Sequence, residues 1–150
     1  MITHYRHTGL VVQNIKKSKN FYCNILNLRI IQNFIEEGDY FNNLIGEKNK
    51  RAKVIKAISS DFIYLELIEF INSKKAKRKK PENYTKIGAI HICFTVKNIE
   101  NLYKKLKKNK VLCISKPLAS DFDDVKTFFC YDPDYNLVQL VEGKPIKIKV

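Results

Sequence analysis

The stretch HTGLVVQNI, from His7 to Ile15, returns in the second half of the chain as HICFTVKNI, from His91 to Ile99. Both copies read H-x4-V-x-N-I. A second pair of stretches, LELIE (Leu65–Glu69) and VQLVE (Val138–Glu142), follows in the same order. Two matched pairs in the same order indicate a duplicated unit, so the two halves of the chain are expected to fold alike.

Each half has the pattern of one strand, one helix and three further strands. The apolar run after each histidine is typical of a buried strand, and Asn14 and Asn98 stand where they can cap a helix. Helices are expected over 15–26 and from Ile99 onward, where apolar residues recur at i, i+3, i+4 and i+7. Between turn residues, strands are predicted at 28–37, 52–59 and 62–70, then at 111–116, 124–131 and 137–142. The segments 38–51 and 116–124 are expected to be loops.

The fold class predicted from this order is α+β, with two paired βαβββ modules. A four-stranded sheet with a helix on one face leaves its other face to line a cavity, so two such sheets are expected to form a cup-shaped sheet of eight strands. The whole chain, 1–150, is predicted to be one domain. It comprises module one at about 4–70, a basic linker at 71–85, module two at about 86–143 and a short tail at 144–150.

Lysine dominates the charge of this chain. The 150 residues carry a formal net charge of +13, from 28 Lys and Arg against 15 Asp and Glu. Such a charge attracts anionic partners. Arginine, which reads nucleic-acid bases through bidentate contacts, is scarce, so nucleic acid is disfavoured and a small anionic molecule is expected. The run KKAKRKK (Lys74–Lys80) is interpreted as a solvated loop, with a substrate-phosphate clamp or a nucleic-acid contact as alternatives.

The remaining composition indicates a cytoplasmic protein. No apolar stretch approaches the roughly 20 residues that a membrane-spanning helix needs, and the N-terminus has no apolar signal core. The 4 Cys are scattered and form no CxxC pair, which suits a reducing compartment and argues against a zinc knuckle.

Strand alternation selects four polar side chains as a candidate metal site. Equivalent positions of duplicated halves lie around a pseudo-two-fold axis, so His7 should face His91 and Glu66 should face Gln139. Two imidazoles and two side-chain oxygens suit one divalent ion, which could be Zn, Ni, Co, Mn or Fe. A carboxylate within an apolar run such as YLELIEF is rarely buried unless it is paired or metal-bound. The alternative is an exposed Glu66 and two histidines with ordinary structural roles.

Four stretches resemble the vicinal oxygen chelate superfamily, in family order and over nearly the whole chain: HTGLVVQNIKKSKNFYCNILNL, FIYLELIEF, GAIHICFTVKNIENLYKKL and FFCYDPDYNLVQLVE. The superfamily includes glyoxalase I, methylmalonyl-CoA epimerase, extradiol dioxygenases and the fosfomycin- and bleomycin-resistance proteins. The resemblance implies a metal held by His7, Glu66, His91 and Gln139. It also implies a homodimer, because family members commonly pair modules across a dimer.

By this resemblance, the leading hypothesis is a metal-dependent lyase or isomerase of the glyoxalase I (lactoylglutathione lyase-like) type. Its substrate would be a small α-hydroxycarbonyl compound or thiol adduct. Family isomerases commonly move a proton with a Glu, and Gln139 stands at the fourth ligand position, which leaves Glu66 as the catalytic base. Gln139 also counts against the dioxygenase and fosfomycin-resistance activities.

Two alternatives remain open. The first is a ligand-sequestering protein of the bleomycin-resistance type, which needs no metal and which Gln139 favours. The second is an acyl-CoA epimerase that would hold the phosphates of CoA with its basic run.

The sequence also offers weaker candidates for substrate binding and one unusual turn. Four residues are weaker candidates for binding the substrate: Cys93, Arg51, Tyr64 and Phe129. The family turn DPDG reads DPDY here, from Asp132 to Tyr135. Asn136 is expected to adopt the left-handed conformation that the missing Gly would supply.

Overall fold

The chain divides into two compact units, residues 1–78 and 79–150, and each is described by itself. The computed structural model describes residues 1–60, 64–74, 79–80, 84–85, 87–121 and 124–144. Residues 62–63 of the predicted strand 62–70, residues 75–78 of the basic run and residues 145–150 of the predicted tail lie outside this part. Within the described ranges, no helix has the length and apolar character needed to cross a membrane.

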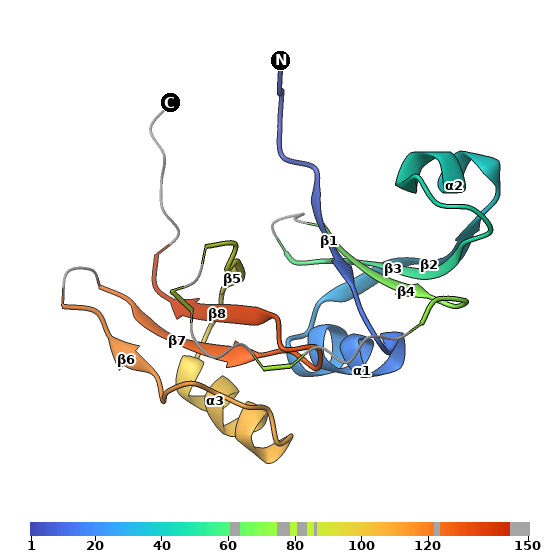
Figure 1. Cartoon of the computed structure of the whole chain (residues 1–150). Coiled ribbons are helices and arrows are strands. Elements are labelled where there is room, and N and C mark those ends of the chain that lie inside the picture. The colour runs from blue at the N-terminus through green and yellow to red at the C-terminus, as the bar shows by residue number, and fades with distance from the viewer. Residues whose placement is uncertain (61–63, 75–78, 81–83, 86, 122–123, 145–150) are drawn as a thin grey trace. The chain divides into compact units, whose positions relative to one another are not determined.

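Unit 1 contains a four-stranded mixed sheet with the order β1-β4-β3-β2 (Figure 1). The two terminal strands of the repeat, β1 and β4, pair in parallel, and the other neighbours are antiparallel. A parallel pair requires a long crossover connection, and the helix after β1 begins that crossover. The strands are β1 (His7–Val11), β2 (Arg29–Glu37), β3 (Arg51–Ile58) and β4 (Tyr64–Phe70).

Unit 2 repeats this topology with the order β5-β8-β7-β6, and β5 runs parallel to β8. The equal strand order is the structural counterpart of the two matched sequence pairs. The predicted α+β class, with two four-stranded sheets of the same topology, is therefore confirmed. The strands are β5 (His91–Thr95), β6 (Leu118–Ala119), β7 (Lys126–Tyr131) and β8 (Leu137–Glu142).

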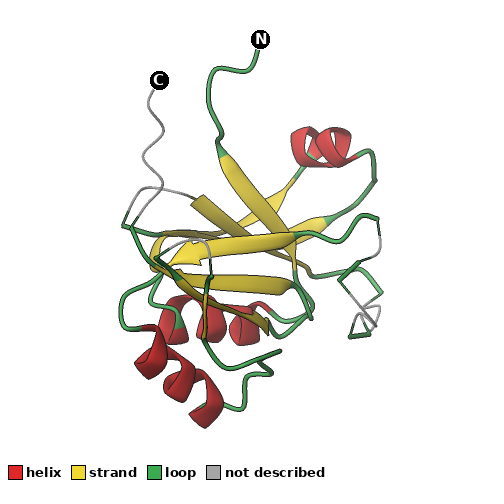
Figure 2. Ribbon diagram, turned by 90° about the vertical axis from the view of Figure 1, so that its left-hand side faces the viewer, coloured by secondary structure: helices red, strands yellow, loops and turns green. Residues whose placement is uncertain are grey.

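Each sheet is covered on one face by the helix that follows its first strand (Figure 2). In unit 1 this helix is α1 (Ile15–Lys19), which continues as the π-helical segment η1 (Asn20–Ile25), and in unit 2 it is α3 (Ile99–Lys108). Both predicted caps are confirmed. The Asn14 side chain accepts from the Lys17 amide at 3.1 Å, and the Asn98 side chain accepts from the Asn101 amide at 3.3 Å.

The last glutamate of each matched pentapeptide also caps the helix of its own unit. Glu69 at the end of β4 accepts a hydrogen bond from the Ile15 amide at 3.3 Å. Glu142 at the end of β8 accepts from the Asn98 amide at 2.5 Å and from the Ile99 amide at 3.4 Å. The first amides of a helix have no partner inside it, and a carboxylate there also complements the helix dipole. The repeated glutamate therefore has a structural role.

A further helix, α2 (Asp39–Ile45), corrects the prediction of a loop over 38–51. The helix has 7 residues, so its apolar residues Phe41, Leu44 and Ile45 form a single i, i+3, i+4 set, which is too short a pattern to distinguish a helix from a loop. It packs on the sheet face opposite α1 (Figure 1). The cluster beneath it consists of buried Phe41, Ala52 and Val54, with Phe34, Ile45, Ile68 and Phe70 packed around them.

The predicted strand 111–116 is wrong. Only Cys113 pairs there, in an isolated antiparallel bridge with Cys130 of β7. The amides of Ile114 and Tyr131 hold this segment beside β7, but it bends over 114–116 before the two-residue strand β6 begins. Pro117 lacks an amide hydrogen and cannot donate to a continuous ladder, which is the physical reason for the interruption.

The turn DPDY is built differently from the prediction. Tyr135, with φ of 60°, takes the left-handed conformation that was expected of Asn136. Asp132 determines this choice, because its carboxylate accepts from the Asp134 and Asn136 amides at 2.9 and 2.7 Å. It also accepts from the Asn136 side chain at 2.8 Å, so Asn136 is held in place by both its backbone and its side chain.

Replacing Lys110 with glycine is expected to stabilise the protein. Lys110 has φ of 58° just beyond α3. The Lys110 amide donates to Lys107 and the Val111 amide donates to Leu106, which is the pattern of a helix end that favours Gly. Removing the Cβ should raise the free energy of unfolding by about 0.5–1 kcal/mol in urea denaturation, after allowance for the more flexible unfolded chain. Lys104→Gly, at an exposed position in the middle of α3, is the matched control and should lower it by about 1 kcal/mol. An equal loss in both variants would contradict this account.

Candidate functional site

His7 and Glu66 lie together on the face of the unit 1 sheet that α1 leaves uncovered. β1 and β4 run parallel with Gly9 opposite Glu66, so the histidine and the carboxylate point to the same side. His7 Nε2 is 3.6 Å from Glu66 Oε2. The Glu66 side chain is 17% exposed, whereas its neighbours Leu65 and Leu67 are buried on the opposite face. The pattern YLELIEF therefore alternates as a half-buried strand does.

Lys56 is a site residue that the sequence analysis missed. It stands directly opposite Glu66 in the β3–β4 ladder, and its Nζ is 3.3 Å from Glu66 Oε1. The same ammonium lies 5.4 Å from the centre of the Phe34 ring, a cation–π distance. Lysine is abundant in this chain, so nothing in the composition singles Lys56 out. Only the ladder register, which pairs it with Glu66, could have identified it.

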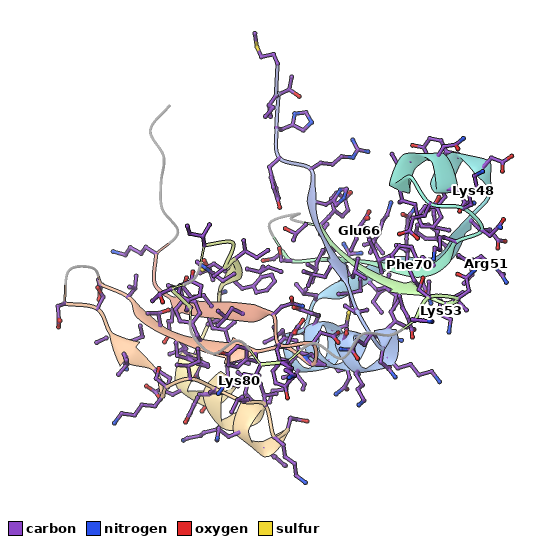
Figure 3. All side chains as sticks on the ribbon, in the orientation of Figure 1. Lys48, Arg51, Lys53, Glu66, Phe70 and Lys80 are labelled. Carbon is purple, nitrogen blue, oxygen red and sulfur yellow. The ribbon has the colours of Figure 1, made fainter. Side chains whose placement is uncertain are left out.

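A pocket of about 440 Å³ opens at this pair. Glu66 projects from the sheet of unit 1 on the side away from Lys53 (Figure 3). A register shift in β2 between Ile30 and Gln32 allows two consecutive β2 residues to reach the pocket. The lining residues are Arg6, His7, Ile31, Gln32, Lys56, Tyr64 and Glu66. Three of them carry basic nitrogen and one carries a carboxylate, so the pocket suits a polar, anionic molecule.

His91 of unit 2 is oriented by two aromatic rings. The Tyr84 hydroxyl and His91 Nδ1 are hydrogen-bonded. The Phe129 ring packs edge-on to the imidazole with 5.4 Å between centroids, and the Tyr84 ring lies 5.7 Å from it. A partner on Nδ1 leaves Nε2 as the nitrogen that can ligate a metal, which is the usual arrangement of a metal-binding histidine.

Gln139 of unit 2 is oriented by a chain of hydrogen bonds. Thr127 Oγ1 donates its single proton to the Leu140 carbonyl at 3.0 Å. The same hydroxyl oxygen must therefore accept from Gln139 Nε2, which lies 3.1 Å away. Because the amide nitrogen is committed to Thr127, the carbonyl oxygen Oε1 is the atom that Gln139 can offer to a ligand.

The weaker substrate-binding candidates have different surroundings. Tyr64 lines the unit 1 pocket, and Phe129 packs on His91. Arg51 is ion-paired with Glu37 at the far end of β3 and is not among the residues that line this pocket. Cys93 is exposed beside Gln139 in the β5–β8 ladder, and desolvation raises the pKa of its thiol. A neutral thiol is a poor nucleophile and a poor metal ligand.

The basic run is described only in part. Lys80 has its ammonium 5.6 Å from the centre of the Tyr131 ring. Residues 75–78 fall outside the described residues. The roles predicted for the basic run, as a solvated loop, a substrate-phosphate clamp or a nucleic-acid contact, therefore stay predictions.

Each unit by itself carries part of the candidate donor set. Within the described residues, no group of three or more His, Cys, Asp or Glu is close enough to hold a metal. Each unit offers one imidazole and one side-chain oxygen: His7 and Glu66 in unit 1, and His91 and Gln139 in unit 2. In unit 2, the hydrogen bonds to His91 Nδ1 and from Gln139 Nε2 leave His91 Nε2 and Gln139 Oε1 as the atoms available to a ligand. This mixed N/O set suits Zn, Ni, Co, Mn or Fe.

The chain belongs to the Glyoxalase/Bleomycin resistance protein/Dioxygenase superfamily, whose family profile matches residues 4–140. The resemblance to the vicinal oxygen chelate superfamily is thereby confirmed. Among curated proteins, none matches this sequence.

Solved structures share the fold at low sequence identity. A glyoxalase family protein from Bacillus cereus is 15% identical, with a TM-score of 0.85 and 95% of each chain covered. The fosfomycin resistance protein FosX from Listeria monocytogenes is 18% identical, with a TM-score of 0.65 and 96% of each chain covered. A second structure of that protein, in complex with Mn(II) and a sulfate ion, is 18% identical, has a TM-score of 0.64, and covers 96% of this chain and 95% of its own.

Proposed function

We propose that this protein is a metal-dependent lyase or isomerase of the glyoxalase I type. Its substrate is a small α-hydroxycarbonyl compound or thiol adduct with two adjacent oxygens. The observation that carries the proposal is the largely buried Glu66 carboxylate in the polar pocket of unit 1, 3.6 Å from His7. Family membership supports the same reading.

His7, Glu66, His91 and Gln139 would hold one divalent ion. When bound, the ion would supply a Lewis acid for the adjacent oxygens of the substrate. Glu66 accepts the proton from the carbon next to the carbonyl and returns it to the neighbouring carbon. No other Asp or Glu lines the described pocket, so Glu66 is the carboxylate assigned to this step. Gln139 cannot accept a proton in this way and acts as a neutral oxygen ligand.

Proton transfer next to a carbonyl gives a direct test that does not require the natural substrate. The protein is loaded in turn with Ni, Co, Zn, Mn or Fe(II) and incubated with hydroxyacetone or a hemithioacetal in D₂O. Exchange of the α-hydrogen for deuterium, followed by NMR, is expected with at least one metal. If no metal supports exchange or isomerisation across a broad panel of such compounds, the proposal is wrong.

A second candidate function is ligand sequestration of the bleomycin-resistance type. It is favoured by the Lys56–Glu66 ion pair, because an ammonium at 3.3 Å already balances the one carboxylate among the four candidate ligands. Tight ligand binding by metal-free protein, together with no exchange under any metal, would support this function. The predicted homodimer, cytoplasmic location and acyl-CoA epimerase alternative gain no specific observation and stay predictions.

Replacing Tyr84 with phenylalanine is expected to weaken metal binding. The variant keeps the ring against His91 but removes the hydroxyl that bonds Nδ1. Loss of such a partner typically costs 10–100-fold in metal affinity, so a decrease of about that size is expected in competition with a fluorescent chelator. Tyr40→Phe, on the exposed side of α2, is the control and should leave the affinity unchanged. Equal affinity in all three proteins would show that the hydroxyl does not orient the ligand.

A further inference from the structure

Lys56 has a position in unit 1 whose counterpart in unit 2 is occupied by an aromatic ring. Lys56 stands opposite Glu66 in the β3–β4 ladder, and Phe129 stands opposite Gln139 in the β7–β8 ladder. Phe129 packs on His91 and contributes no charge. The fold therefore does not require a cation at this point of the sheet, and the lysine in unit 1 needs an explanation of its own.

The ion pair with Glu66 explains only part of the bonding capacity of Lys56. An ammonium has three donors, and Glu66 Oε1 at 3.3 Å accounts for one of them. The Lys56 side chain is 31% exposed and lines the pocket. The Phe34 ring, 5.4 Å from Nζ, limits where the ammonium can move. A cation held at the wall of a pocket with donors still available is suited to an anion inside that pocket.

The other lining residues strengthen this chemistry. Arg6 lies at the same pocket and offers a guanidinium, while Gln32 and Tyr64 offer neutral hydrogen-bond donors. Charge-assisted hydrogen bonds from Lys or Arg to a carboxylate or phosphonate are about twice as strong as neutral ones. Among the described lining residues Glu66 is the only acidic one, and an entering anion would compete with its carboxylate for the basic groups of the pocket.

We propose that Lys56 binds the acidic group of the substrate, and that this group, a carboxylate or a phosphonate, takes over the ammonium from Glu66. The substrate is then a small organic acid that also carries the two adjacent oxygens. This inference rests on the proposed function for the identity of the pocket as a substrate site. The anion and Glu66 share one cation, so binding of the acid frees the Glu66 carboxylate from Lys56. Lys56 is a substrate-binding residue in this scheme, and Arg6 provides a second positive charge.

The test uses protein that has been stripped of metal with EDTA and then dialysed free of the chelator, which is itself a carboxylate, so that it does not depend on turnover or on the metal. Acetate and methylphosphonate are titrated separately into the full-length chain, and binding is followed by NMR shifts of the protein amides. Lys56→Met, which keeps the aliphatic stem, is expected to weaken binding of the preferred anion about tenfold or more. Lys53→Met is the matched control, because Lys53 is on the same strand but opposite Glu69, on the other face of the sheet. It removes the same charge and should leave binding unchanged.

A Glu66→Gln variant tests the exchange itself. Removing the competing carboxylate is expected to strengthen anion binding several-fold, whereas a Glu66 that merely helps to shape the pocket would give weaker binding or no change. In the unchanged protein, whichever of acetate and methylphosphonate binds more tightly identifies the acidic group as a carboxylate or a phosphonate. The inference is overturned by failure of both anions to bind, by equal losses in the Lys56→Met and Lys53→Met variants, or by unchanged or weaker binding in Glu66→Gln. A chain that binds these anions but shows no α-hydrogen exchange with any metal would refute the proposed function alone.

Discussion

A Glu66→Gln variant, loaded with the activating metal, is expected to lose turnover by about 10²–10⁴-fold, the usual contribution of a positioned general base. Glutamine has nearly the same shape as glutamate and can still offer an oxygen to a metal, but it cannot accept a proton from carbon. The measurement is the rate of α-hydrogen exchange or isomerisation under saturating substrate. Metal content is determined on the same sample, so that a loss of ligation is distinguished from a loss of the base.

The control for this variant is Glu37→Gln. Glu37 is on the neighbouring strand β2 and is ion-paired with Arg51, away from the pocket-lining residues. It should retain the turnover of the unchanged protein. If Glu66→Gln remained as active as that control while metal content was equal in both, Glu66 would not be the base, and the proposed mechanism would be wrong.

The double variant His7→Ala/His91→Ala is expected to lose its bound metal entirely. Imidazole nitrogens are the strong donors of the proposed set, and the remaining carboxylate and amide oxygens are weak ligands for late transition metals. Plasma mass spectrometry of protein dialysed against Ni, Co, Zn or Mn should give about one ion per chain for the unchanged protein, as a four-ligand centre requires, and none for the variant.

The chain provides a matched control because it has 3 His. The third, His4, lies in the exposed segment before β1, and His4→Ala should keep its metal. The single variants add a further distinction. If one ion is held by ligands from both units, His7→Ala and His91→Ala should each weaken binding. If His91→Ala binds as tightly as the unchanged protein, unit 2 does not contribute a ligand, and the four-residue centre is wrong.

The fold was predictable because its signals are repeated and local. Asn14 and Asn98 indicate helix starts, because each side chain accepts a capping hydrogen bond from the amide three residues later. Strand alternation placed Glu66 on the face opposite Leu65 and Leu67, as found. A motif that occurs twice in the same order constrains the topology more strongly than either copy alone, and the two sheets have the same strand order.

The three errors have different physical causes. α2 is too short for a helical period to stand out, and it is stabilised by packing of Phe41 on Ala52 and Val54. The segment 111–116 is apolar enough for a strand, but the bends before Pro117 interrupt its ladder. In the DPDY turn, the Asp132 carboxylate chooses Tyr135 rather than Asn136 for the left-handed position, and no residue preference predicts that choice.

The sequence indicated the four candidate ligands as a set, and their role stays a prediction, whereas the lysine beside Glu66 was not predicted. His7, Glu66, His91 and Gln139 stand at matched positions of the repeat, so the sequence alone indicated them as a set. Lys56 breaks the repeat, since its counterpart is Phe129, and it is one lysine among many. Tyr84 and Thr127 each form a hydrogen bond with His91 and Gln139, respectively, and these contacts depend on the folded structure.

The paired glutamates at the ends of β4 and β8 bear on the history of the molecule. Glu69 reaches the start of its helix across 54 residues, and Glu142 reaches its own across 44. Each of these ties is complete within one half of the chain. A half-length ancestor would thus have carried both the strand glutamate and the helix amides that it caps. Gene duplication and fusion would copy this contact unchanged. The candidate ligands differ between the two copies, Glu66 in one and Gln139 in the other, whereas the capping glutamate is the same in both.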